Sequence, residues 1–314
     1  KKLFADVFGG SLNLSKAFAR RGMVSEGYDL IFGKEQDFLN PEVITEFKRR
    51  LALKLYGCAA FALPCITWSR ARRKNRKGPG PLRGDAIDTL FGLRNLSDKD
   101  LKRVIQGNRL LEVTLDLIDC CIQNDVIVIL ENPQTSRVWK VPELTKRMQK
   151  NNCKIYNTDF CQFDQEWKKG TKFVVWLGDG GSFDDFRLEL PKCSGKCGIC
   201  SYSGLSHRIL QGKAPGGTFW TKIAEPYPTK LCDIIATAVT NYICMRGTPL
   251  GSSMTKVAVT APSVPCAVAT LVRDAGPDKR TRSADVVSTD RSELFEAGEG
   301  KRRRLPYKFV DMYE

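Results

Sequence analysis

The stretch "VIVILENP" (residues 126–133) gives the strongest indication of the fold. It is a continuous apolar run, rich in β-branched residues, that stops at Glu131, Asn132 and Pro133. A short run of this kind is typical of a strand that is buried on both faces in a parallel sheet. We therefore predict a buried strand here, with polar side chains where it ends.

Strand-like and helix-like segments alternate on both sides of this run. We predict further strands at residues 3–8, 27–32, 58–65, 153–163 and 171–178. We predict helices at residues 11–22, 41–56, 98–125, 142–150 and 231–243, with Ser11 as the N-cap of the first. This alternation favours an α/β fold with a doubly wound sheet.

The domain organisation follows from changes in composition. Residues 1–245 read as one α/β domain, in which residues 181–221 form a small insert rich in Cys, Gly and Ser. Residues 246–314 mix Pro, Ser, Thr and charge without periodicity, which favours a linker or a disordered basic tail.

Charge and cysteine content limit the class of protein. Lys and Arg total 50 against 35 Asp and Glu, a net charge of +15. Such an excess favours nucleic acid as a partner, although a solvated basic surface is the alternative. The 12 cysteines are scattered and no secretory signal is visible, so we expect reduced thiols and an intracellular protein, nuclear if eukaryotic. No run of 18 apolar residues occurs, so we expect no membrane partner.

Cys65 lies where the predicted strand at 58–65 ends, and a basic segment follows it. Open α/β sheets bind ligands at this edge, and cations stabilise a thiolate over a thiol. Cys65 is therefore a candidate nucleophile, with a buried structural cysteine as the alternative. The basic segment is a candidate phosphate-binding loop, or else a solvated loop or a nuclear-import patch. Its cations are Arg70, Arg72, Arg73, Lys74, Arg76, Lys77 and Arg83.

Two other strand ends carry polar residues. Glu131 ends the buried strand. A carboxylate there is costly unless it has a bonding partner or a function, so Glu131 is a candidate functional residue. The alternative is an acid of a loop or a helix cap. The first predicted strand leads through Gly9 and Gly10 into a helix, and Asp29 follows about twenty residues later. That distance is typical of a ribose-binding acid in a nucleotide fold, although a ligand-free turn would look the same.

The insert carries Cys193, Cys197, Cys200 and His207, with spacing Cys-x3-Cys-x2-Cys-x6-His. Three thiolates and one imidazole suit tetrahedral zinc. Cys161 is a fifth candidate that could replace Cys197. The sequence therefore predicts one zinc ion, or else free thiols in a Gly-rich loop.

The motifs "DVFGGS", "PCITWS", "LENP" and "EPYPTKLCDIIA" occur in the order found in C-5 cytosine-specific DNA methyltransferases. The chain resembles that family over residues 3–236, and especially the methyltransferase-like segments of dinoflagellate mobile-element polyproteins. The resemblance implies a Rossmann-like sheet that uses S-adenosylmethionine. It implies that Cys65 attacks cytosine C6 and that Glu131 holds the base, with Lys168 or Lys169 replacing the family's arginine.

The resemblance also assigns a cofactor site. The residues that match it are Asp6, Phe8, Gly10, Asp29, Asp37, Pro64 and Tyr227. The expected function is methyl transfer from S-adenosylmethionine to cytosine C5 in DNA through a covalent Cys intermediate. The alternatives are the same reaction on RNA, or an inactive, zinc-stabilised module of a mobile-element polyprotein that binds nucleic acid.

Overall fold

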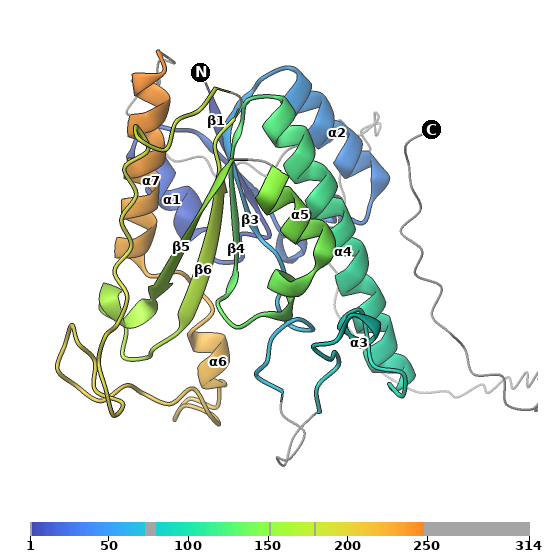
Figure 1. The fold of residues 1–314 in the computed structure, drawn as a ribbon, viewed down its shortest axis with the longest axis vertical. Coiled ribbons are helices and arrows are strands. Elements are labelled where there is room, and N and C mark those ends of the chain that lie inside the picture. Colours follow the sequence, from blue (N-terminus) through green and yellow to red (C-terminus); the bar gives the residue numbers. More distant parts are fainter. Residues whose placement is uncertain (1, 73–79, 151, 179, 248–314) are drawn as a thin grey trace, which may run out of the picture. The chain divides into compact units, whose positions relative to one another are not determined.

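The computed structural model describes residues 2–72, 80–150, 152–178 and 180–247 (Figure 1). The contacts between Cα atoms divide the chain into two units, Lys1–Cys266 and Ala267–Glu314. All described residues belong to the first unit. The predicted tail, residues 246–314, lies outside the described residues except for Arg246 and Gly247.

The described residues form a sheet of six strands in the order β2-β1-β3-β4-β6-β5. The strands are β1 (Leu3–Val7), β2 (Ser25–Tyr28), β3 (Tyr56–Ala62), β4 (Ile127–Pro133), β5 (Cys153–Asp159) and β6 (Gly170–Trp176). The first four are parallel, whereas β6 runs antiparallel to both β4 and β5. The predicted α/β class is thus confirmed as a mixed sheet that is consistent with a Rossmann-like fold.

Helices cover both faces of the sheet, as Figure 1 shows. One face carries α1 (Asn13–Arg20) and α7 (Thr229–Met245), and the other carries α2 (Pro41–Ala52), α4 (Asp98–Gln123) and α5 (Pro142–Lys150). The side chains of β4 show why both faces of the sheet need a helical layer. Ile127 and Ile129 join the core under α1 and α7, while Val128 and Leu130 join the core under the other layer. Alternate side chains of one apolar run therefore fill two cores.

The order of the strands predicts a ligand-binding position at the carboxyl ends of β1 and β3. The chain passes from β1 to β2 on one side and then crosses to β3 on the other side of β1. Ligands bind in such sheets at the carboxyl ends of the strands beside this change of direction. Because β6 is antiparallel, it begins at the same edge, where Thr171 pairs with Pro133 and Gly170 with Asp159.

Several predicted boundaries were wrong. The predicted helix at residues 41–56 ends at Ala52, and the strand predicted at 58–65 runs from Tyr56 to Ala62. The strand predicted at residues 153–163 ends at Asp159, because a 3-10 turn follows.

The start of α1 and the end of β2 also differ from the prediction. The predicted strand at residues 27–32 ends at Tyr28, because the Asp29 side chain accepts a hydrogen bond from the Ile31 N–H and caps the 3-10 turn Leu30–Phe32. Ser11 does not cap α1, since Leu12 occupies that position in a left-handed conformation. Asp6 serves this end of the helix instead and accepts hydrogen bonds from the N–H (3.1 Å) and hydroxyl (2.7 Å) of Ser15.

The predicted insert has little regular structure. Its described part contains the isolated bridges Ile199–Ser206 and Lys213–Phe219, and then the short helix α6 (Trp220–Ile223). No helix within the described residues is long and apolar enough to cross a membrane.

Candidate active site and metal cluster

The loop after β3 carries Cys65 to the carboxyl edge of the sheet. The Asn132 side-chain amide donates to the Leu63 carbonyl (2.7 Å), which ties the end of β4 to the chain just before Cys65. The Cys65 carbonyl accepts from the N–H groups of Trp68 (3.0 Å) and Ser69 (2.8 Å). These bonds turn the chain just beyond Cys65, which follows the end of β3 at Ala62.

The electrostatics of Cys65 differ from the prediction. Burial raises the pKa of its thiol to about 11, the Glu131 carboxylate adds to that rise, and the Lys169 ammonium opposes it. Among the described residues, the cation that acts most on this thiol is therefore Lys169 and not a residue of the basic segment. Arg70 is paired elsewhere, with Asp85.

Glu131 forms the second part of the site. Its side chain is buried, and its Oε2 accepts a hydrogen bond from the Tyr227 hydroxyl (2.8 Å). Burial raises the pKa of Glu131, whereas Lys169 and the Tyr227 hydrogen bond lower it. A buried carboxyl with a raised pKa can hold a proton and donate it in a hydrogen bond.

Lys169 is the third part of the site. Its Nζ donates to the main-chain carbonyls of Ala224 (3.0 Å) and Glu225 (3.2 Å) and lies 4.6 Å from the centroid of the Phe160 ring. The neighbouring Lys168 is exposed and donates to the Cys193 carbonyl (3.3 Å) instead. Of the two candidate lysines, Lys169 is therefore the one that faces Cys65 and Glu131.

A cavity of about 380 Å³ lies beside this site, between the carboxyl ends of β1, β2 and β3 and helix α4. Four of the seven predicted cofactor residues line it, namely Phe8, Asp29, Asp37 and Pro64. The other three do not. Asp6 is a buried residue of β1 whose carboxylate accepts from Ser15 of α1. The Gly10 N–H donates to the Asp29 carboxylate (3.0 Å), and the Tyr227 hydroxyl donates to Glu131.

Gln36 is a cavity residue that sequence reasoning missed. It ends the 3-10 turn Lys34–Gln36, lines the cavity and is 1% exposed. Within the described residues, neither its Nε2 nor its Oε1 has a hydrogen-bond partner. An unpaired buried amide is costly and calls for an explanation such as a ligand. The only sequence signal was its place beside Asp37.

The basic segment divides into parts with different roles. Arg83 is 1% exposed, lies 3.5 Å from the centre of the Trp68 ring and donates to Asn108 (2.6 Å) and Thr67 (2.9 Å). The prediction that Arg83 binds phosphate is therefore wrong, because its guanidinium serves the core. Arg72 forms an ion pair with Asp100, in which the Arg72 Nη1 and Asp100 Oδ1 atoms are 3.6 Å apart. Four predicted residues lie outside the described ranges: Arg73, Lys74, Arg76 and Lys77.

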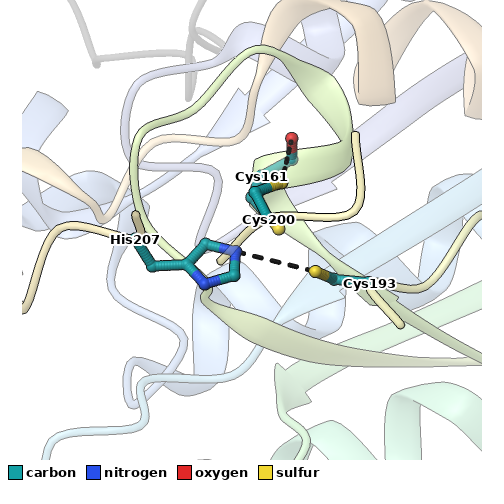
Figure 2. A group of neighbouring side chains, drawn as sticks. All are labelled: Cys161, Cys193, Cys200 and His207. Carbon is teal, nitrogen blue, oxygen red and sulfur yellow. Dashed lines mark hydrogen bonds between the residues drawn. The ribbon is translucent and has the colours of Figure 1, made fainter. Parts of the chain in front are cut away.

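The metal-ligand candidates converge in space. Figure 2 shows Cys161, Cys193, Cys200 and His207 together, and their ligand atoms lie within 4.8 Å of one another. In a tetrahedral zinc site with bonds of about 2.0–2.3 Å, ligand atoms are roughly 3–4 Å apart. Cys197 is exposed and outside the group. The cluster could therefore hold a metal ion such as zinc, with Cys161 rather than Cys197 as the fourth ligand.

The thiols of the cluster differ in acidity. Burial opposes ionisation of Cys193, but hydrogen bonds from Ser201 lower its pKa to about 6. Burial raises the pKa of Cys161 to about 12. Because a metal binds thiolates, its binding would release the Cys161 proton and depend on pH.

The carboxyl edge thus combines a thiol, a carboxyl and an ammonium group beside a cavity with carboxylates and aromatic rings. A thiol next to a buried carboxyl and a cation is an arrangement that covalent catalysis uses. Comparison with protein-family models and with curated proteins gave no match. The function is therefore inferred from the site itself.

Proposed function

We propose that this chain transfers a methyl group from S-adenosylmethionine to C5 of cytosine in DNA, through a covalent bond to Cys65. One observation carries the proposal. The Glu131 carboxylate lies near enough to the Cys65 thiol to raise its pKa. Both residues follow the carboxyl edge of the sheet, beside a cavity lined by four residues that the family resemblance assigned to the cofactor.

The residues of the cavity fit the proposed cofactor. Phe8 and Phe38 offer aromatic contacts to a purine, and Asp29 and Asp37 offer carboxylates to hydroxyl and amino groups. The unpaired amide of Gln36 offers both a donor and an acceptor. S-adenosylmethionine, when bound, supplies an electrophilic methyl group.

The residues of the chain have complementary roles in this reaction. The Cys65 thiolate adds to C6 of the cytosine, and the electron pair displaced toward C5 forms the bond to the methyl group. Glu131 in its protonated form donates to the ring nitrogen N3 and so draws electrons away from C6. C5 then loses its proton to water, and the bond between Cys65 and C6 breaks. A cytosine that reacts in this way has to leave the base stack.

The Lys169 ammonium favours the reactive form of Cys65. It lowers the pKa of Cys65, while burial, Glu131 and Glu225 raise it. Protonation of Glu131 removes one of these three opposing effects. The same proton that prepares Glu131 for the base therefore also makes the Cys65 thiol easier to ionise.

The proposal is tested by methyl transfer from labelled S-adenosylmethionine to duplex DNA, with RNA as a second substrate. We expect transfer to DNA by the unchanged protein and a loss of more than ~10³-fold in Cys65→Ala. Cys58→Ala is the control, because Cys58 is a buried cysteine on β3 that faces the core. Full activity of Cys65→Ala would overturn the mechanism, and transfer to RNA alone would reassign the substrate.

We propose further that the metal in the cluster is zinc. Three thiolates and one imidazole in a compact group, with three of the four side chains buried, are typical of a closed structural zinc site. The expected content is about one zinc ion per chain.

A second candidate function is an inactive module that binds nucleic acid and is stabilised by zinc. The raised pKa of Cys65 favours it, because a protonated thiol is a poor nucleophile. This candidate predicts salt-dependent binding to DNA with no methyl transfer by the unchanged protein. The transfer assay above separates the two.

A further inference from the structure

The metal cluster and the candidate active site share one short segment of chain. Cys161 belongs to the 3-10 turn Phe160–Phe163, between β5 and β6, and Phe160 directly precedes it. The Phe160 N–H donates to the Lys169 carbonyl (3.1 Å). The turn that supplies a metal ligand is therefore bonded to the main chain of the active-site lysine.

The side chain of Phe160 contacts the active site as well. Its ring centroid lies 4.6 Å from the Lys169 Nζ, and its edge-to-face contact with Tyr227 has a centroid separation of 6.2 Å. Tyr227 in turn donates to Glu131. One fully buried ring thus touches two of the groups that surround the Glu131 carboxyl.

Cys193 of the insert also bonds to the segment that connects β5 and β6. The Asp159 carboxylate accepts from the Cys193 N–H (3.0 Å), and the Lys168 ammonium donates to the Cys193 carbonyl (3.3 Å). Cys161, Cys193 and Cys200 form a buried group of their own, separate from the core that holds Phe160 and Phe163. Ligand bonds from Cys161 to a metal would therefore add to that packing in fixing the turn and would tie the start of the insert to it.

We propose that Phe160 is a positioning residue: metal held by Cys161 fixes the Phe160 ring, and the ring fixes the Lys169 ammonium beside Glu131 and Cys65. This inference rests on the proposed function. It assigns the metal a role in the reaction without any contact between metal and substrate.

Physical reasons favour an aromatic ring at this position. Lysine is a point charge on a flexible stem, and its place must be set by its surroundings. Two main-chain carbonyls accept from the Lys169 ammonium, and the face of the Phe160 ring attracts the same cation. A ring displaced by a loose turn would leave the ammonium free to move away from Cys65.

The cofactor cavity is independent of this segment. Its lining comes from the ends of β1, β2 and β3 and from α4, and none of the lining residues lies between β5 and β6. Loss of the metal should therefore slow the chemistry and leave the affinity for a cofactor analogue nearly unchanged.

The experiment measures the rate at which iodoacetamide alkylates Cys65 as a function of pH, resolved by mass spectrometry of the Cys65 peptide. The samples are the zinc-loaded full chain, the same chain after chelation, Phe160→Leu and Phe163→Leu. Phe163→Leu is the matched control, since both rings are buried in the same turn and core. We expect chelation and Phe160→Leu to move the alkylation profile to higher pH, with a rate loss of about threefold to tenfold at neutral pH.

The control should keep the original profile. An unchanged profile after chelation, or an equal shift in both Leu variants, would overturn the proposal. Alkylation requires neither S-adenosylmethionine nor DNA, so its outcome is separate from that of the proposed function. A shifted profile in a protein without methyl transfer would contradict the proposed function alone.

Discussion

The two halves of the carboxyl edge are built in different ways. The cavity half follows β1, β2 and β3, which are regular strands that pack between helices on both faces. The cluster half lies between the end of β5 and the start of β6 and in the insert, where the described residues include isolated bridges and a group of three buried cysteines. Regular elements and their packing form the cavity half, whereas a metal bound to the cluster would add ligand bonds to the packing of the other half.

This difference separates the expected consequences of losing each half. A defect in the metal cluster should loosen the insert and reach the active site only through the hairpin between β5 and β6. A defect in the packing beside α4 should destabilise the fold as a whole and leave metal binding intact. The following predictions test that separation.

The largest expected effect is loss of a metal ligand. In Cys200→Ser or His207→Ala, zinc affinity should fall by more than ~100-fold, beyond what loss of a supporting residue costs. Proteolysis should then cut within the insert, and the cavity half should stay protected. Zinc analysis and peptide mapping measure both effects. Cys197→Ser is the control, because Cys197 is exposed and outside the cluster. Equal damage in the control, or no zinc in the unchanged protein, would remove the distinction between the halves.

The next effect concerns Arg83, which joins the loop after β3 to α4 on the cavity side. Its guanidinium donates to Thr67, Asn108 and the Val104 carbonyl, all in buried surroundings. Arg83→Gln should lower the free energy of unfolding by about 3 kcal/mol, because buried acceptors lose charged donors. Urea unfolding gives the value.

Arg70→Gln provides the comparison, since its ion pair with Asp85 is at the surface and should contribute about 0–1 kcal/mol. If the two variants unfolded alike, the structural role of Arg83 would be wrong. Zinc content should be the same in both.

The smallest effect concerns Gln36 in the cavity. Gln36→Leu removes a buried amide that has no partner within the described residues, so the free energy of unfolding should rise by about 1 kcal/mol. Affinity for S-adenosylhomocysteine should fall about tenfold, because a Gln amide can pair with the edge of adenine. Calorimetry and thermal unfolding measure the two changes. Gln106→Leu is the control on the exposed rim of the same cavity. A loss of stability without a loss of affinity would exclude a ligand contact.

Much of the fold could be predicted because its signals are local. The apolar run of β4 and its end at Pro133 could be predicted from the sequence, and so could the start of helix α2 at Pro41. Polar residues at those ends, such as Cys65 and Glu131, could be grouped because parallel strands share an edge. The direction of β6 could not be predicted, since a buried strand has the same pattern in either direction.

Other features depend on contacts that spacing does not reveal. Arg83 looks like its neighbours in a basic run, and only the approach of Trp68 and α4 makes it a core residue. The choice between Cys161 and Cys197 stayed open because Cys161 reaches the cluster through the fold of the β5–β6 hairpin. Gln36 carries no periodic signal, so its burial appears only in three dimensions.

The central claim is that Cys65 bonds to cytosine. The most direct test incubates the protein with S-adenosylmethionine and a pool of duplexes that carry 5-fluorocytosine in varied sequence contexts. Fluorine at C5 cannot leave as a proton does, so the bond from Cys65 to C6 should persist and be seen by denaturing electrophoresis and peptide mass spectrometry. We expect an adduct at Cys65 in the unchanged protein and none in Cys65→Ala. Bound DNA without any adduct, or an adduct on another cysteine, would contradict the account.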